Sequence, residues 1–170
     1  MFNELEFWKL CFLIDYFVKI RELIRKSMSK PVEIDSSIRT VEWKDNKVIM
    51  IEQTKLPNEL IFVEYDDFNQ VANAIKTLIV RGAPAIGVSG AFGLALAVLQ
   101  SKATIKDNLL SDLEDARKIL FATRPTAVNL GWGLEKIMNV AKTGETVEQI
   151  RELVISTAKK MADEDIEINK

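Results

Sequence analysis

The sequence has no histidine and only one cysteine, Cys11, among its 170 residues. The missing histidine removes the commonest general base and the commonest ligand of metals, so the sequence predicts no metal site. A single cysteine excludes an intramolecular disulfide, and we therefore expect a reducing, cytoplasmic location. Acid–base chemistry within this chain would have to use carboxylates, lysines or tyrosines.

An excess of charge of one sign is also lacking. The 23 basic and 25 acidic residues are mixed along the chain and leave a net charge of −2. No basic stripe of the kind that nucleic-acid binding requires is visible, so we expect no nucleic-acid partner. The hydrophobic content of 48% is ordinary for a globular domain with a core of its own.

The N-terminal segment, residues 1–27, is rich in aromatic side chains. Its phenylalanines are Phe2, Phe7, Phe12 and Phe17. Charged residues interrupt every long apolar run and no small-residue cleavage site follows, so the segment predicts neither a signal peptide nor a membrane anchor. Two interpretations stay open: an added packing or oligomerisation helix, or an upstream translation start with Met28 as the working start.

Residues 28–65 predict a small antiparallel β element. Residues 39–44 and 47–53 are β-prone, and Asp45-Asn46 between them tolerates a tight hairpin turn. Residues 60–65 are a third candidate strand. The fold class expected is therefore mainly α, with this small β element at its N-terminal side.

From Asp66 onward the apolar spacing becomes helical, so residues 66–170 predict a helical bundle. Asp66 or Asp67 is expected to cap the first helix, and Pro125 to start a later one. Residues 146–149 have the form of a capping box that opens the last helix, whose terminal carboxylates are typical of a solvated helix end. The uncharged stretch 82–99 is rich in glycine and alanine, which favours a central bundle helix over a membrane span.

Arg81 is an isolated charge in a long uncharged stretch and is followed by Gly82, Ala83 and Pro84. A guanidinium stays charged at working pH, so its burial would require an anion or many acceptors. Proline is favoured in the first turn of a helix, which places the amides of Gly82 and Ala83 at a partly positive helix N-terminus. The motif predicts a phosphate-binding turn, the alternative being that Arg81 pairs with a remote carboxylate.

Arg124 repeats this pattern, because it precedes Pro125 and is followed by the polar residues Thr126 and Asn129. The two arginines are expected to converge on one anionic ligand; the alternative is that Arg124 is a solvated cap residue. Glycines at 87, 90 and 93 are interpreted as a packing face.

Several motifs together resemble one known family. Arg39-Thr40-Val41-Glu42-Trp43 and the stretch 51–57 resemble the N-terminal signature of methylthioribose-1-phosphate isomerases, except that Glu52 stands where aspartate is usual. Residues 81–87 and 123–130 are similar to two further family motifs, in family order from about Met28 to the end of the chain.

The resemblance implies an aldose–ketose isomerase of methionine salvage that needs no redox or metal cofactor. It implies that Arg81, Gly82, Ala83 and Arg124 bind the sugar-phosphate substrate. In the family, the catalytic cysteine and aspartate lie in a Rossmann-like C-terminal half that is absent here, so no catalytic residue is expected in this chain. Activity would then need a C-terminal half chain, and a homo-oligomer is also expected.

Three alternatives remain at this stage. A regulatory subunit of the related initiation factor 2B family, with alpha, beta and delta members, would use the same pocket to sense a ligand. A ribose-1,5-bisphosphate isomerase differs in its substrate. A truncated gene product would have no function of its own. Trp43 and residues 53–57 favour the isomerase.

Overall fold

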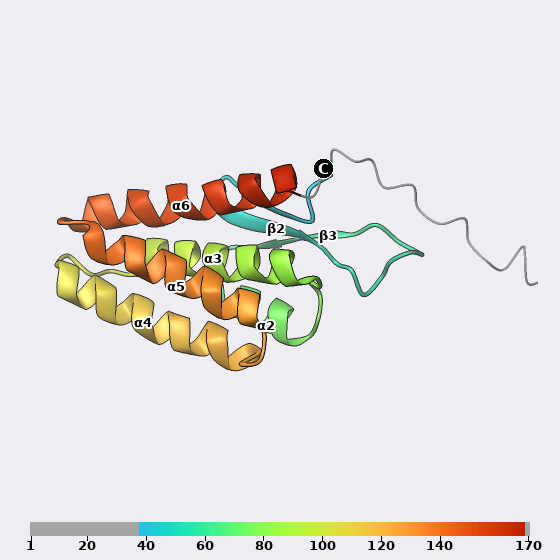
Figure 1. Ribbon diagram of the computed structural model, residues 1–170, viewed down its shortest axis with the longest axis horizontal. Coiled ribbons are helices and arrows are strands. Elements are labelled where there is room, and N and C mark those ends of the chain that lie inside the picture. The colour runs from blue at the N-terminus through green and yellow to red at the C-terminus, as the bar shows by residue number, and fades with distance from the viewer. Residues whose placement is uncertain (1–37, 169–170) are drawn as a thin grey trace, which may run out of the picture. The chain divides into compact units, whose positions relative to one another are not determined.

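The computed structural model describes residues 38–168, so the predictions for the segment 1–27 lie outside the described part. The elements in chain order are β1 (Val41–Lys44), β2 (Lys47–Ile51), β3 (Phe62–Tyr65), α2 (Phe68–Lys76), α3 (Ala83–Gln100), α4 (Lys106–Thr123), α5 (Val128–Thr143) and α6 (Val147–Ile168). Figure 1 shows the helices gathered beside a small sheet. The mainly helical fold class with a small antiparallel β element is confirmed.

The three strands form one antiparallel sheet in the order β1-β2-β3. Asp45 and Asn46 connect the first two strands with φ values of 51° and 59°. Two positive φ angles in a two-residue loop match the right-handed twist of paired strands, which is why Asp-Asn serves here. Val48 and Met50 on β2 are fully buried, as the alternation of a half-buried strand requires.

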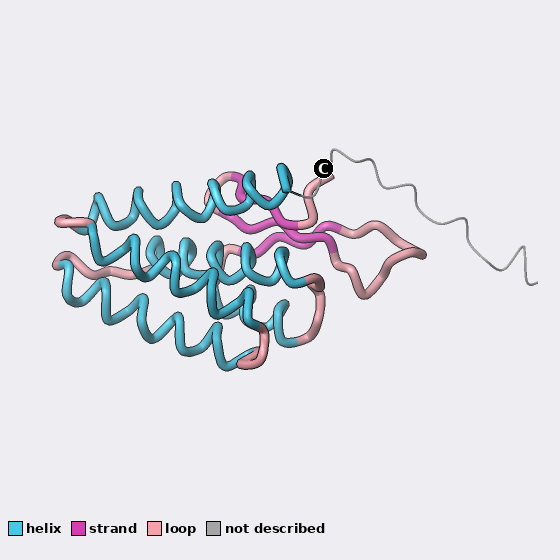
Figure 2. Tube along the Cα trace, in the orientation of Figure 1, coloured by secondary structure: helices cyan, strands magenta, loops and turns pink. Residues whose placement is uncertain are grey.

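Helix α3 is the centre of the helical part. Helices α2, α4, α5 and α6 all pack against it, and every residue from 86 to 98 is buried. By length and composition α3 could cross a membrane, yet 72% of its apolar window is buried by its neighbours. The prediction of a central bundle helix is therefore confirmed. Figure 2 shows α3 enclosed among the other helices, with the loops at the two ends of the bundle.

The predicted helix starts are partly right. The Asp67 side chain caps α2 by accepting the Asn69 N–H at 2.7 Å. Helix α5, however, begins at Val128 and not at Pro125. The Ala127 N–H donates to the Arg124 carbonyl at 3.0 Å, which closes a turn around Pro125 before the helix can start.

Helix α6 begins with a variant of the predicted capping box. Thr146 Oγ1 accepts the Gln149 N–H at 3.2 Å, as expected. The Gln149 side chain accepts the N–H of Glu145 at 3.0 Å and so reaches one residue further back than in the usual box.

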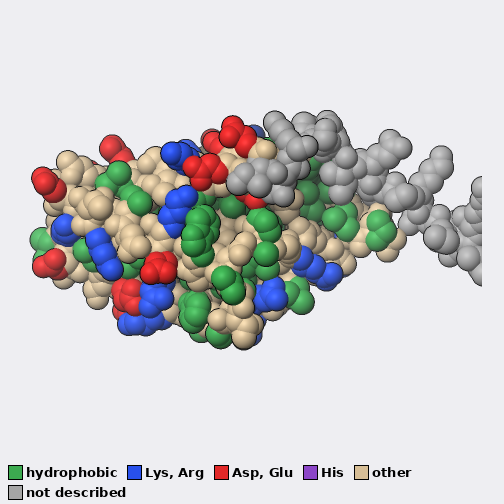
Figure 3. All heavy atoms as spheres, viewed as in Figure 1, with side chains coloured by type: hydrophobic (Ala, Val, Ile, Leu, Met, Phe, Trp, Pro, Cys, Tyr) green, Lys and Arg blue, Asp and Glu red, His purple; other side chains and the backbone are tan. Residues whose placement is uncertain are grey.

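The sheet and the bundle share one core. The Trp43 and Phe92 rings lie 5.6 Å apart between centroids and join β1 to α3. On the outside, Figure 3 shows basic and acidic side chains interspersed on the visible face, in keeping with the mixed charge of the sequence.

Candidate functional site

The first turn of α3 presents backbone amides without a side-chain cap. Its N-cap is Gly82, which has φ 90° and ψ 133°, a conformation that residues with a side chain rarely adopt. Within residues 38–168 no side chain caps these amides, and no acidic residue lies in this turn. The positive end of an 18-residue helix therefore remains available to an anion.

A second uncapped helix start lies next to it. Ala127 is the N-cap of α5 and makes no side-chain capping bond. The starts of α3 and α5 together enclose a pocket of about 360 Å³. It is lined by Gly82, Ala83, Ile86, Arg124, Thr126, Ala127, Val128 and Asn129. We call this cavity the Arg124 pocket.

The structure thus brings three of the four predicted binding residues, Gly82, Ala83 and Arg124, around one cavity. The geometry combines an arginine with two helix N-termini, a set of donors that can bind a phosphate group.

Arg81 is placed differently from what its sequence context led us to expect. Its side chain is exposed and does not line the Arg124 pocket. Its Nε donates to the Leu78 carbonyl at 3.1 Å. Arg81 is not buried, because it lies on the surface turn that precedes α3, so its guanidinium needs no buried anion.

Gln53 holds the backbone that leads into α3. Its main-chain N–H donates to the Ile79 carbonyl at 2.9 Å, and its Oε1 accepts the Arg81 N–H at 2.9 Å. Sequence reasoning placed Gln53 only in a family signature. No local pattern indicates this role, since the partner lies 28 positions away.

Helices α3 and α5 approach closely behind the pocket. A Cβ added at Gly133 would lie 2.6 Å from the Gly87 carbonyl oxygen, and one at Gly87 would lie 2.9 Å from the Asn129 oxygen. These distances leave no room for a side chain. The interpretation of the α3 glycines as a packing face is confirmed, and this contact keeps the two helix starts together.

A second cavity, of about 240 Å³, adjoins the first. It is lined by Pro84, Gly87, Val88, Asn129, Trp132, Met161, Glu164 and Asp165. We call it the Trp132 cavity. At the end of α6, Asp163 and Glu167 are exposed as expected, whereas Glu164 and Asp165 are half-buried and line this cavity because α6 packs along α3.

No group of three potential ligands that could hold a metal ion occurs in the described part of the chain. The Arg124 pocket offers hydrogen-bond donors and one guanidinium. The Trp132 cavity offers two carboxylates and an indole.

Comparisons with known proteins agree with this architecture. The model of the initiation factor 2 subunit family matches residues 79–170. A methylthioribose-1-phosphate isomerase from Geotalea uraniireducens (strain Rf4) is 44% identical over 134 residues, which are 78% of this chain and 39% of that protein. The chain thus spans about two fifths of the length of the relatives it matches.

Two solved structures are also similar. The 5-methylthioribose 1-phosphate isomerase from Pyrococcus horikoshii OT3 superposes with a TM-score of 0.73 at 42% identity, over 81% of this chain and 39% of that one. The translation initiation factor eIF-2B, subunit delta, from A. fulgidus gives a TM-score of 0.73 at 44% identity, over 77% and 38%.

Proposed function

The chain belongs to the initiation factor 2 subunit family, and on that basis we propose that it carries the sugar-phosphate-binding part of an aldose–ketose isomerase. The proposed substrate is 5-methylthioribose 1-phosphate, the compound in the names of its relatives, and the proposed setting is methionine salvage in the cytoplasm.

The observation that supports the proposal is the convergence of two uncapped helix starts and Arg124 on one pocket. A phosphate in this pocket would accept hydrogen bonds from the amides of Gly82 and Ala83 and a charge-assisted bond from Arg124. Arg81 is the fourth proposed ligand. Its exposed side chain would exchange the Leu78 carbonyl for the phosphate, because an anion is the stronger acceptor.

Binding and turnover are separable in this proposal. Isomerisation moves a proton between neighbouring carbons, which needs an acid–base group beside the sugar. The residues that line the Arg124 pocket include no carboxylate, histidine, lysine, tyrosine or cysteine, the side chains that usually serve as general acids and bases. We therefore propose that this chain binds substrate but turns it over only with a C-terminal half chain, in an assembly that is also a homo-oligomer.

Titration calorimetry of the 170-residue chain with methylthioribose 1-phosphate and with inorganic phosphate tests the binding. Arg124→Ala should weaken the affinity for both ligands by about tenfold or more, because a hydrogen bond to a charged group contributes roughly 1.5–3 kcal/mol. Arg117→Ala is the matched control, since Arg117 pairs with Glu114 on α4 and lines neither cavity. Equal affinities for wild type and Arg124→Ala would exclude the phosphate site.

A coupled isomerase assay tests the second step. The chain alone should show no turnover, and mixing it with the C-terminal region of a relative should restore it. Turnover by the chain alone would show that its own residues perform the proton transfer, and Glu164 and Asp165, which line the neighbouring cavity, would be the first carboxylates to test.

A regulatory role is the second candidate, favoured by the similarity to the eIF-2B delta structure. In that case the Arg124 pocket would sense a phosphorylated ligand. Ligand binding without turnover in the mixed assay, together with stable association with an initiation-factor complex, would favour this role.

A further inference from the structure

We propose that the Trp132 cavity is the subsite for the uncharged, apolar end of the ligand, and that Trp132 determines this specificity. The inference rests on the proposed function, because it assigns the phosphate to the neighbouring Arg124 pocket.

The two cavities are neighbours along the first turn of α3. Ala83 lines the Arg124 pocket and the next residue, Pro84, lines the Trp132 cavity. Asn129, in the first turn of α5, lines both. In this proposal a sugar anchored by its phosphate at Ala83 extends past Pro84 and Asn129 toward Trp132.

Trp132 is a large apolar side chain that the fold does not bury. It is 56% exposed, whereas the neighbouring core residues of α5, Leu130 and Leu134, are at most 1% exposed. An exposed indole beside a cavity of about 240 Å³ offers apolar area that a ligand can cover.

The indole is also held in place. Lys136 Nζ lies over the Trp132 ring, 5.0 Å from its centroid, and pairs with Glu164 Oε2 at 3.2 Å. This contact links α5 to α6 beside the Trp132 ring and restricts the rotation of the ring. A fixed aromatic surface costs less entropy on binding than a mobile one.

The ionisable side chains that line the two cavities are of opposite sign. The Arg124 pocket has a guanidinium and two helix N-termini, whereas the Trp132 cavity is lined by two carboxylates, Glu164 and Asp165, and by no basic side chain of the described chain. Lys136 and Lys160 pair with Glu164 at 3.2 and 3.8 Å but do not line the cavity.

The pair of cavities thus fits a ligand with one anionic and one neutral end. A methylthio group would place sulfur against the indole, a favourable contact, and would remove apolar surface from water. A second phosphate at the same position would face the carboxylates. The structure therefore favours a sugar monophosphate with an apolar substituent over a sugar bisphosphate.

Titration calorimetry of the 170-residue chain with three ligands tests this assignment: methylthioribose 1-phosphate, ribose 1-phosphate and ribose 1,5-bisphosphate. Trp132→Ala should weaken binding of the methylthio compound by about fivefold to tenfold and leave ribose 1-phosphate unchanged. Trp132→Phe should retain most of the preference. Phe62→Ala, which removes an aromatic side chain 49% exposed on β3, is the matched control and should change nothing.

A double variant tests the effect of the two carboxylates that line the Trp132 cavity. Glu164→Gln combined with Asp165→Asn should raise the affinity for ribose 1,5-bisphosphate relative to the monophosphates. Thermal melting of each variant shows whether it is folded at the temperature of the titration.

The outcomes separate this inference from the proposed function. One contrary result is that Trp132→Ala loses equal affinity for the methylthio compound and for ribose 1-phosphate, and another is that the wild type binds the two with equal affinity. Either result would overturn the subsite and leave the proposed phosphate site standing. A wild type that binds none of the three ligands would overturn both.

Discussion

The side-chain oxygen of Gln53 accepts the main-chain N–H of Arg81 at 2.9 Å and thereby joins the end of the sheet to the start of α3. The Gln53 N–H donates to Ile79 in the same segment. Gly82, the N-cap of α3, follows Arg81 directly, so the bond to Gln53 fixes the backbone immediately before α3.

Replacing Gln53 by alanine should therefore affect both stability and binding. The Arg81 N–H loses its acceptor, and we expect a loss of about 1 kcal/mol in the free energy of unfolding together with weaker phosphate binding. Urea unfolding and calorimetry measure the two effects. Gln100→Ala is the control, because Gln100 bonds the Asp66 carbonyl away from both cavities, and it should leave phosphate affinity unchanged.

Arg81→Ala should abolish most sugar-phosphate binding and leave the fold largely intact. The Arg81 side chain is exposed and its Nε donates to the Leu78 carbonyl, so the side chain contributes little to stability. A charge-assisted bond to phosphate is lost, which predicts a decrease in affinity of about tenfold or more. Unchanged affinity with an unchanged melting temperature would remove Arg81 from the proposed site.

Gly133→Ala should separate α3 from α5. The added methyl group would lie 2.6 Å from the Gly87 carbonyl oxygen, so the helices must move apart at a cost of about 1–3 kcal/mol. Phosphate binding should weaken as well, because both helix starts form the Arg124 pocket.

Gly131→Ala is the matched control on the same helix. Its new methyl group would meet the Phe121 ring at an ordinary 3.4 Å, and alanine favours the helix by about 1 kcal/mol over glycine. Denaturant unfolding of both variants compares them directly. Equal destabilisation by the two substitutions would contradict the close-packing explanation.

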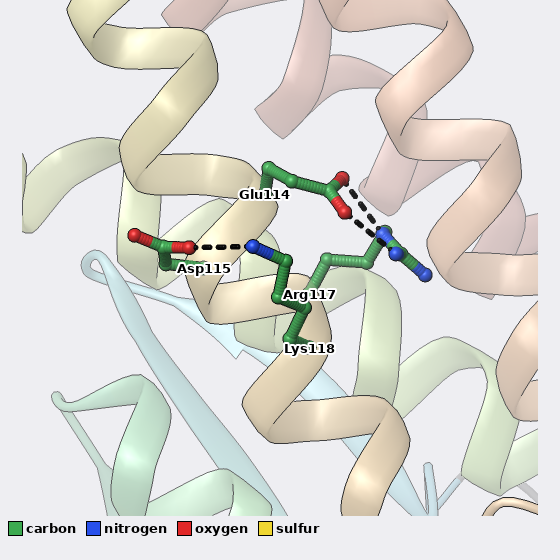
Figure 4. Close-up of polar contacts among 4 residues, drawn as sticks. All are labelled: Glu114, Asp115, Arg117 and Lys118. Atoms are coloured by element: carbon green, nitrogen blue, oxygen red, sulfur yellow. Dashed lines mark hydrogen bonds and ion pairs between the residues drawn. The ribbon is translucent and has the colours of Figure 1, made fainter.

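The Glu114–Arg117 pair on α4 should make a small contribution to the free energy of unfolding that is lost in acid. Figure 4 shows the two side chains joined by two bonds, Arg117 Nη2 to Glu114 Oε1 at 2.6 Å and Nε to Oε2 at 2.8 Å. The Arg117 hydrogen bond lowers the pKa of Glu114 below its ordinary value. The pair therefore stabilises the fold above that ordinary pKa, and the contribution is lost as pH falls through the lowered folded pKa.

Glu114→Gln should reduce the free energy of unfolding by less than about 1 kcal/mol at pH 7, because both side chains are about one-third exposed. The difference from wild type should be smaller at pH 3 than at pH 7, because the wild-type carboxyl takes up protons as pH falls toward its lowered pKa. Urea unfolding at the two pH values measures it. Asp115→Asn, which removes the more exposed pair with Lys118, should have a smaller effect at pH 7.

Short-range signals account for what sequence reasoning predicted correctly. The Asp45-Asn46 turn, the Asp67 cap and the apolar spacing along α4 each depend on neighbours a few positions away, and all three are present. The start of α5 was misplaced because proline at 125 suits a turn as well as a first helical residue, and the Ala127–Arg124 bond selects the turn.

The composition and spacing of this chain by themselves determined its fold class, its central apolar helix and the motif at Arg81-Gly82-Ala83-Pro84. Only the tertiary structure decided that Gly82, Ala83 and Arg124 line one pocket, that Arg81 lies outside it, and that Trp132 remains exposed beside it. The physical reason is that hydrogen bonding and periodicity act along the chain, whereas a shared cavity depends on how closely α3 and α5 pack, which the Gly87–Gly133 contact sets.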